Sequence, residues 1–336
     1  MRSNPLRPLR RLRAAILLAS FALPQAACTS VLYTVGYGIG VPFLYREAEL
    51  PPEQVQLDVP YQLSLGDAAS DKHRLDFFRP AQTERGWPTL IFVHGGGWTS
   101  GDRAYEAAGY DIYRNIGRFF AARGVGVAMI SYRLQPGASW RDQIDDVRSA
   151  LVWVHAQARL GRLGADPDAI FLSGHSAGAY LATYVALDSE GLRSVGVPPS
   201  SICGIVPVSG AAFDLTDERT WELGASRSYY EERFRDAMST EHWTAEASPV
   251  QFASADAPPA LILYAGGEEA ELQRQSQVLN EALQAVGAQS RLFEVPGEGH
   301  QRMVLTLSRD DKPSAPAVLD FIRERSCGAD ETHSAG

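Results

Sequence analysis

A serine between two glycines is the residue of this 336-residue chain best placed to do covalent chemistry. The run Leu172-Ser173-Gly174-His175-Ser176-Ala177-Gly178 follows an apolar stretch and precedes a helix-forming one. Gly-x-Ser-x-Gly in that context is typical of a nucleophilic serine on a sharp strand-to-helix turn. The glycines let strand and helix approach without Cβ clashes, and the helix start aims backbone N–H groups at a developing oxyanion. Ser176 is the candidate nucleophile; an unreactive serine in a glycine-rich turn is the alternative.

A second glycine-rich motif, His94-Gly95-Gly96-Gly97-Trp98, directly follows the apolar run 90–93. Acyl transfer needs hydrogen-bond donors where the carbonyl oxygen becomes negative, and glycines let main-chain N–H groups come close. A glycine triplet alone is often only a loop. Its position about 80 residues before the serine motif makes the pair of motifs more specific than either motif alone.

The elements that must position these motifs alternate along the chain. Short apolar, β-branched runs predict strands at 74–79, 89–93, 125–131, 169–173, 202–208, 260–264 and 291–295. Helical patterns predict helices at 110–122, 141–158, 177–187, 271–286 and 315–325. This alternation predicts an α/β fold with a mainly parallel sheet covered on both faces, in which the first two strands pair antiparallel at one edge. Residues 211–250, rich in aromatic and charged side chains, interrupt the rhythm and are expected to form an inserted cap.

Composition and charge exclude several classes of protein. With 45% apolar and 10% aromatic residues the chain is not disordered, and its 336 residues allow one large α/β domain or two smaller ones. Five arginines lie in the first 27 residues. If that segment is removed, the remaining chain has 26 Lys and Arg against 40 Asp and Glu, which is a net charge of −14. Nucleic acid is therefore not an expected partner.

The N-terminus has the pattern of an export signal. Five arginines precede the apolar run 14–23 and the small-residue sequence Ala26-Ala27-Cys28, which resembles a bacterial lipoprotein processing site. We expect a signal peptide over 1–27, a lipidated Cys28, membrane association through that lipid, and a tether or membrane-proximal segment over 28–54. Simple secretion and an uncleaved anchor are the alternatives. Of the other two cysteines, Cys203 and Cys327, a pair is possible in an exported protein, but a lone buried thiol is the expectation for Cys203.

Taken together, these motifs resemble the α/β-hydrolase superfamily, in particular its carboxylesterase branch with hormone-sensitive-lipase-like and kynurenine-formamidase-like enzymes. The resemblance covers about residues 72–325. It rests on residues 94–98, 131–134, 145–153, 164–168 and 174–178. It implies an α/β-hydrolase domain over 55–326 with the cap at about 211–250, and a polar tail at 327–336. It also implies an oxyanion hole formed by Gly96, Gly97 and Ala177.

The family's order of serine, acid and histidine points to a base late in the chain. His300 follows the last predicted strand and is the expected base. In the kynurenine-formamidase-like pattern an acid stands eight residues before the serine of Arg-Gln-Ser, which here gives Glu268. Glu269 is the alternative, and Glu271 is more typical of a first helical turn. The neighbouring pair Asp145-Asp146 is expected on a helix, where a solvated face or a loop-bracing ion pair is its role.

The resemblance implies a serine carboxylesterase that hydrolyses a small-molecule ester through an acyl-enzyme and needs no metal or organic cofactor. An aryl formamide hydrolase with the same machinery and a non-catalytic envelope protein with this fold are the alternatives. Trp98, Trp221, Tyr229 and Trp243 are candidates for the pocket wall, although core packing is the commoner role of such side chains. The pattern implies a bacterial cell-envelope location, with a periplasmic or secreted protein as the alternative.

Overall fold

The computed structural model describes residues 41–42, 44–62, 71–81 and 85–325. The predicted signal peptide, Cys28, Cys327 and the polar tail lie outside the described residues. The described part of the predicted tether, from residue 41, packs against the domain. Val41 is buried, and the backbone N–H of Ala48 donates to Oδ1 of Asn115 at 2.8 Å.

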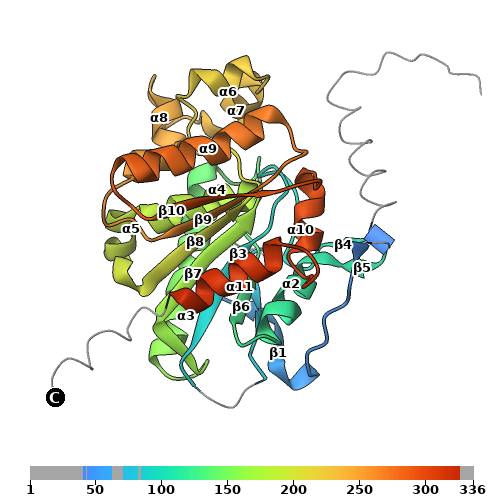
Figure 1. Cartoon of the computed structure of the whole chain (residues 1–336). Coiled ribbons are helices and arrows are strands. Elements are labelled where there is room, and N and C mark those ends of the chain that lie inside the picture. Colours follow the sequence, from blue (N-terminus) through green and yellow to red (C-terminus); the bar gives the residue numbers. More distant parts are fainter. Residues whose placement is uncertain (1–40, 43, 63–70, 82–84, 326–336) are drawn as a thin grey trace, which may run out of the picture.

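Eight strands form one sheet in the order β1-β2-β6-β3-β7-β8-β9-β10 (Figure 1). Their bounds are β1 Val55–Pro60, β2 Arg74–Phe78, β3 Trp87–Val93, β6 Gly126–Ile130, β7 Ala165–His175, β8 Ile202–Val208, β9 Ala260–Ala265 and β10 Ser290–Val295. The six strands from β6 to β10 in that order are parallel to their neighbours, whereas β2 is antiparallel to both β1 and β6. A hairpin of β4 (Glu106–Ala107) and β5 (Tyr110–Asp111) forms a separate sheet. The predicted mainly parallel α/β sheet is confirmed.

The predicted pairing of the first two strands is wrong. Strands β2 and β3 are not neighbours, because β6 lies between them and hydrogen-bonds to both. The sequence prediction also missed β1, which pairs with β2 and forms the antiparallel edge. A connection that crosses over the sheet through a helix brings β6 back beside β3, which adjacency in sequence does not reveal.

Helices cover both faces of the sheet, and side-chain alternation along the strands explains the two core layers. In β3, Ile91 and Val93 pack with the helices of one face, whereas Leu90 and Phe92 pack with those of the other. The first face holds α3 (Trp140–Arg159), α4 (Ala177–Leu187) and α9 (Ala270–Ala285); the second holds α2 (Ile112–Ala121) and α11 (Ser314–Glu324). The short helices α5 (Ser189–Ser194) and α10 (Met303–Thr306) lie in connections.

Local sequence explains where the longest helix begins and which face it buries. The Ser139 side chain accepts from the N–H of Asp142, whose side chain accepts from the N–H of Ser139, a capping box worth about 1 kcal/mol. One face of α3 is apolar and buried: Ile144, Val147 and Leu151 are each at most 3% exposed. The Asp145-Asp146 pair divides between its two expected roles. Asp145 is solvated, whereas buried Asp146 accepts hydrogen bonds from the Arg133 backbone and guanidinium and lies 2.9 Å from Nε2 of His73.

Residues 211–250, the predicted cap, lie between β8 and β9 and contain three short helices. These are α6 (Glu218–Glu222), α7 (Arg227–Phe234) and α8 (Trp243–Ala247). In Figure 1 they gather at one end of the molecule, beside α9. Among the described residues, none of the helices combines the length and the hydropathy of a membrane-spanning segment.

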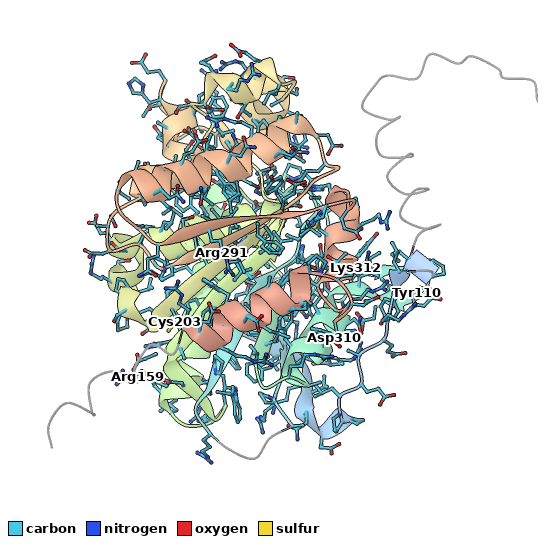
Figure 2. The ribbon with its side chains drawn as sticks, in the orientation of Figure 1. Tyr110, Arg159, Cys203, Arg291, Asp310 and Lys312 are labelled. Atoms are coloured by element: carbon cyan, nitrogen blue, oxygen red, sulfur yellow. The ribbon has the colours of Figure 1, made fainter. Side chains whose placement is uncertain are left out.

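Cys203, labelled in Figure 2, lies on β8 and is buried. The expectation of a lone thiol is wrong, because Cys203 is disulfide-bonded. Burial of a small sulfur side chain in an apolar strand fits a free thiol and a disulfide equally well, so the sequence pattern could not distinguish them.

Candidate active site

Ser176 lies at the junction of β7 and α4 with a backbone that few non-glycine residues adopt. Its φ is 54° and its ψ is −121°, a strained conformation that points the side chain out of the turn. Steric constraints require glycine at the two flanking positions, Gly174 and Gly178. A Cβ on Gly174 would lie 2.5 Å from the Gly178 carbonyl, and one on Gly178 would lie 2.1 Å from the carbonyl oxygen of Val93. The sharp turn is therefore possible only with glycine at both positions.

Hydrogen bonds connect Ser176 to His300 and His300 to Glu268. Nε2 of His300 is 3.0 Å from Oγ of Ser176, and Nδ1 of His300 is 2.9 Å from Oε2 of Glu268. A carboxylate only accepts, so Nδ1 carries the proton that it donates to Glu268; Nε2 of the neutral ring is then left as the acceptor for the serine hydroxyl. This arrangement allows the imidazole to take the serine proton and leaves the resulting positive charge beside a carboxylate.

Glu268 belongs to the loop between β9 and α9, and this loop is tied to the loop that carries His300. The second carboxylate oxygen of Glu268 accepts from the N–H of Ala265 at 3.1 Å, and the N–H of Gly267 donates to the carbonyl of Glu298 at 2.9 Å. The side chain of Glu268 is fully buried. Glu269, the alternative acid, is the N-cap residue of α9, and Glu271 lies in the first turn of that helix.

The glycine motif after β3 lies directly beside the serine. Gly96, Gly97 and Trp98 have φ values of 127°, 59° and 65°, so three consecutive residues have a positive φ. A Cβ on Gly95 would lie 3.3 Å from Cβ of Ser176. The N–H of Ala177 belongs to the first residue of α4, where helical N–H groups have no partner within the helix. These are the features expected of backbone donors around a carbonyl oxygen.

Two buried histidines near Ser176 support the site and are poor bases. Burial lowers the pKa of His94 to about 4, and its ring stacks on Tyr132 at 4.3 Å. Burial, and secondarily the charge of His300, lower the pKa of His175 to about 3. Nε2 of His175 is 2.9 Å from the carbonyl oxygen of His300, a contact that fixes the loop carrying His300. This contact was not predicted, because His175 occupies a variable position of the Gly-x-Ser-x-Gly motif and no sequence pattern reveals its partner.

The four predicted pocket residues have different surroundings. Trp98 is 2% exposed and packs edge-on against Tyr180, Tyr230 and Phe234. Tyr229 reaches the glycine motif, since its hydroxyl lies 2.8 Å from the position a Cβ would take on Gly97. By contrast, Trp221 packs against Tyr230, and Trp243, at the start of α8, packs against the core.

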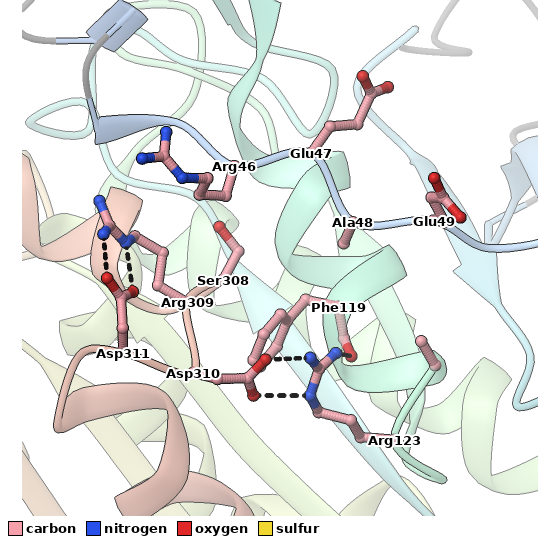
Figure 3. A pocket seen from close by; sticks show the side chains of 11 residues that line it. Arg46, Glu47, Ala48, Glu49, Phe119, Arg123, Ser308, Arg309, Asp310 and Asp311 are labelled. Atoms are coloured by element: carbon pink, nitrogen blue, oxygen red, sulfur yellow. Dashed lines mark hydrogen bonds and ion pairs between the residues drawn. The ribbon is translucent and has the colours of Figure 1, made fainter.

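A cavity of about 650 Å³ lies between residues 46–49, the end of α2 and residues 308–311 (Figure 3). Two ion pairs lie in its wall: Arg309 with Asp311, and Arg123 with Asp310. Its lining includes none of the three residues of the serine–histidine–glutamate chain.

Comparison of the sequence with known proteins identifies relatives of this chain. The sequence profile of the BD-FAE family matches residues 75–283. Esterase LipC of Mycobacterium tuberculosis is 30% identical over 244 residues, which cover 70% of this chain and 58% of that protein. A probable isoprenylcysteine alpha-carbonyl methylesterase of Oryza sativa is 27% identical over 242 residues, covering 70% and 56%. The chain thus spans a little over half the length of these curated relatives.

Solved structures share the fold. Esterase B from Lactobacillus rhamnosis superimposes with a TM-score of 0.68 at 24% identity, covering 89% of this chain and 92% of that one. A truncated carbohydrate esterase from gut microbiota gives a TM-score of 0.62 at 20% identity, covering 83% and 99%. These likenesses establish the α/β-hydrolase fold for the chain.

Proposed function

The chain belongs to the BD-FAE family, and from that premise and the geometry around Ser176 we propose that it is a serine carboxylesterase. The observation that carries the proposal is the continuous chain of hydrogen bonds from hydroxyl to imidazole to carboxylate, at 3.0 Å and 2.9 Å. Nucleophile, base and orienting acid within hydrogen-bond reach are what acyl transfer requires. The names of the relatives, which are esterases, support an ester as the substrate.

Acylation starts with proton transfer from Oγ of Ser176 to Nε2 of His300 as Oγ bonds to the ester carbonyl carbon. The carbonyl oxygen takes the negative charge, and the N–H groups of Gly97 and Ala177, together with Gly96, form the oxyanion hole that stabilises it. Glu268 holds the imidazolium in place. The bond to the alcohol oxygen then breaks, and His300 returns the proton to that oxygen. The products are a free alcohol and an acyl-Ser176 ester.

Deacylation repeats the steps with water. His300 takes a proton from water as its oxygen bonds to the acyl carbon, and the second oxyanion is held by the same donors. When this intermediate collapses, the bond to Oγ breaks and Oγ regains the proton from His300. A carboxylic acid leaves and the enzyme returns to its starting state. None of these steps needs a metal or an organic cofactor.

A substitution of the nucleophile tests the proposal. Ser176→Ala should reduce hydrolysis of p-nitrophenyl acetate by at least 10⁴-fold, on the order seen when a triad serine is removed, with little change in thermal unfolding. Ser194→Ala, the same substitution on an exposed segment, is the matched control and should retain full activity. Activity that survives in Ser176→Ala would refute the assignment.

The relatives named above favour an ester over an aryl formamide as the bond cleaved. Kinetics on N-formylkynurenine beside short p-nitrophenyl esters distinguish the two: we expect a kcat/KM at least tenfold higher for the esters. Esters of graded acyl length then define the pocket, because the walls of an α/β-hydrolase cleft, not its fold, set specificity.

We further propose that the protein is exported and held at a membrane by a lipid on Cys28. The disulfide at Cys203 supports export, because disulfides persist in oxidising compartments. Cys28→Ser should move the protein from the membrane fraction to the soluble fraction of its host without changing ester hydrolysis. An unchanged distribution of Cys28→Ser between the fractions would contradict the lipid anchor.

A further inference from the structure

Helix α7 of the cap packs on the loop that carries the oxyanion glycines. Nε of Arg233 donates to the carbonyl oxygen of Gly97 at 3.3 Å, although the two residues are 136 positions apart. The Tyr229 hydroxyl lies 2.8 Å from the position that a Cβ would take on Gly97. The two α7 side chains are one helical turn apart, so they project from the same face of the helix.

One guanidinium holds three groups together. Besides its bond to Gly97, Arg233 donates from Nη1 to the carbonyl oxygen of Tyr229 at 3.3 Å, and its carbon Cζ lies 3.7 Å from the centre of the Tyr229 ring. The Arg233 side chain is only 13% exposed. A planar guanidinium can donate along its edge while its face stacks on an aromatic ring, and a lysine ammonium cannot reproduce that combination.

The end of α7 and the oxyanion loop are also fixed to a common third segment. Gln135 donates from its side chain to the carbonyl of Arg233 at 2.9 Å and from its backbone to the carbonyl of Trp98 at 3.0 Å. The side chain of Gln143, on α3, donates to the same Trp98 carbonyl at 2.8 Å. The carbonyl oxygens of both Gly97 and Trp98 therefore accept hydrogen bonds from side chains. Gln135 binds both the end of α7 and the loop that carries the glycine motif.

Tyr229 is the more exposed of the two neighbouring tyrosines of α7. Tyr229 is 36% exposed, whereas Tyr230 is 5% exposed and packs edge-on against Tyr229. A phenol held over Gly97, on a residue that is only partly buried, can donate a hydrogen bond to a substrate bound there.

We propose that α7 completes the active site, with the Tyr229 hydroxyl in contact with the ester substrate beside Gly97. Arg233 is the positioning residue: it binds both Tyr229 and the Gly97 carbonyl and so fixes their relative position. The inference rests on the proposed esterase function and deepens it. It assigns to the cap a direct part in the transition state, with Tyr229 as an additional donor on the oxyanion side. Arg233 acts through Tyr229 and Gly97 and does not itself touch the substrate.

The hydroxyl is tested by Tyr229→Phe, which keeps the ring. With p-nitrophenyl acetate we expect kcat to fall about tenfold and KM to stay within twofold, because the lost contact forms chiefly in the transition state. Tyr230→Phe is the matched control on the same helix and should remain within twofold of wild type in both constants. A Tyr229→Phe enzyme with wild-type kcat overturns the role of the hydroxyl.

The positioning role is tested by Arg233→Met and by a double-substitution cycle. Arg233→Met should lower kcat about tenfold in the wild-type background and much less in Tyr229→Phe, because residues that act as a unit are not additive. Arg233→Lys should resemble Arg233→Met, and Arg227→Lys, a second arginine stacked on an aromatic ring of the cap, should change neither constant. Equal losses in both backgrounds, or full activity in Arg233→Lys, overturn the positioning role.

Labelling separates this inference from the proposed function. A fluorophosphonate reacts with an activated serine whatever the cap contributes to ester turnover. If wild type is labelled at Ser176 while Tyr229→Phe turns over esters normally, the inference fails and the esterase proposal stands. If Ser176 is not labelled, both fail.

Discussion

In the proposed mechanism Glu268, a glutamate, is the orienting acid. Its longer side chain folds back so that one oxygen accepts from the N–H of Ala265, the last residue of β9, while the other faces Nδ1 of His300. This bond to the backbone of Ala265 removes the freedom that an extra methylene would otherwise give. The imidazole of His300 is thereby fixed in the tautomer that the proposed mechanism requires.

We expect Glu268→Gln to lower kcat for p-nitrophenyl acetate by on the order of 10³- to 10⁴-fold, because an amide can donate to Nδ1 and so favour the wrong tautomer. Glu269→Gln, the neighbouring position and the same change, is the control and should stay within threefold of wild type. The kcat and KM of both variants, measured at pH 8, show whether Glu268 or Glu269 is the orienting acid. A larger loss in Glu269→Gln would transfer the role to Glu269.

Individual site residues differed in how well the sequence revealed them. Ser176, His300 and Glu268 were predicted from local motifs and the family's order, and the structure brings their side chains within hydrogen-bond distance. The contacts of His175 with His300 and of Arg233 with Gly97 were not predicted. They join segments more than a hundred residues apart and leave no periodic or motif signal in the sequence.

At the scale of elements, buried Asp146 braces α3 against the segment that follows β6. Its carboxylate accepts from the backbone N–H of Arg133 at 2.8 Å and from the Arg133 guanidinium, also at 2.8 Å. Gln143, one turn earlier on α3, donates to the carbonyl of Trp98. Helix α3 is thus connected to the glycine motif that follows β3 as well as to the segment that follows β6.

Asp146→Asn should lower the free energy of unfolding by about 2–3 kcal/mol, which is below the usual cost of breaking a buried pair because Arg133 is a third exposed. Asp145→Asn, one residue earlier with a solvated side chain, should cost less than about 1 kcal/mol. Urea unfolding of the two variants gives both values. Equal losses of unfolding free energy in the two variants would show that the buried Asp146 carboxylate does not stabilise the packing of α3.

Strongly patterned elements were the predictable ones. The bounds of β8 and α4 agree with the prediction, since a continuous apolar run defines each. Strand β1 was missed because it is a mostly exposed edge, with Leu57 half exposed. Strand β7 begins four residues earlier than predicted, because the sequence Asp166-Pro167-Asp168 is typical of a turn. The charged helices of the cap lack a one-sided apolar pattern.

At the scale of the whole molecule, two of the buried histidines, His94 and His175, make stability depend on pH. The pKa of His175 is lowered to about 3 and that of His94 to about 4, whereas in the unfolded chain both take the ordinary value near 6.5. Between pH 6.5 and about 4 the unfolded chain therefore binds protons that the folded chain does not. Stability falls as the pH falls through this window, and these groups add no further loss below about pH 3.

The thermal midpoint should accordingly drop between pH 7 and pH 4.5, and it should drop less steeply in His175→Gln, which lacks one of the two groups. His242→Gln removes a solvated histidine and should keep the steep wild-type dependence. Scanning calorimetry at four pH values measures the three slopes. Parallel slopes for wild type and His175→Gln would contradict the burial argument.

The most direct test of the account is the site of covalent labelling. After treatment with a fluorophosphonate, peptide mapping of the folded protein should find one adduct, on the peptide that contains Ser176, and Glu268→Gln should acquire it much more slowly. A protein that stays unlabelled, or one labelled at another residue, would contradict the claim that Ser176, His300 and Glu268 form a catalytic unit.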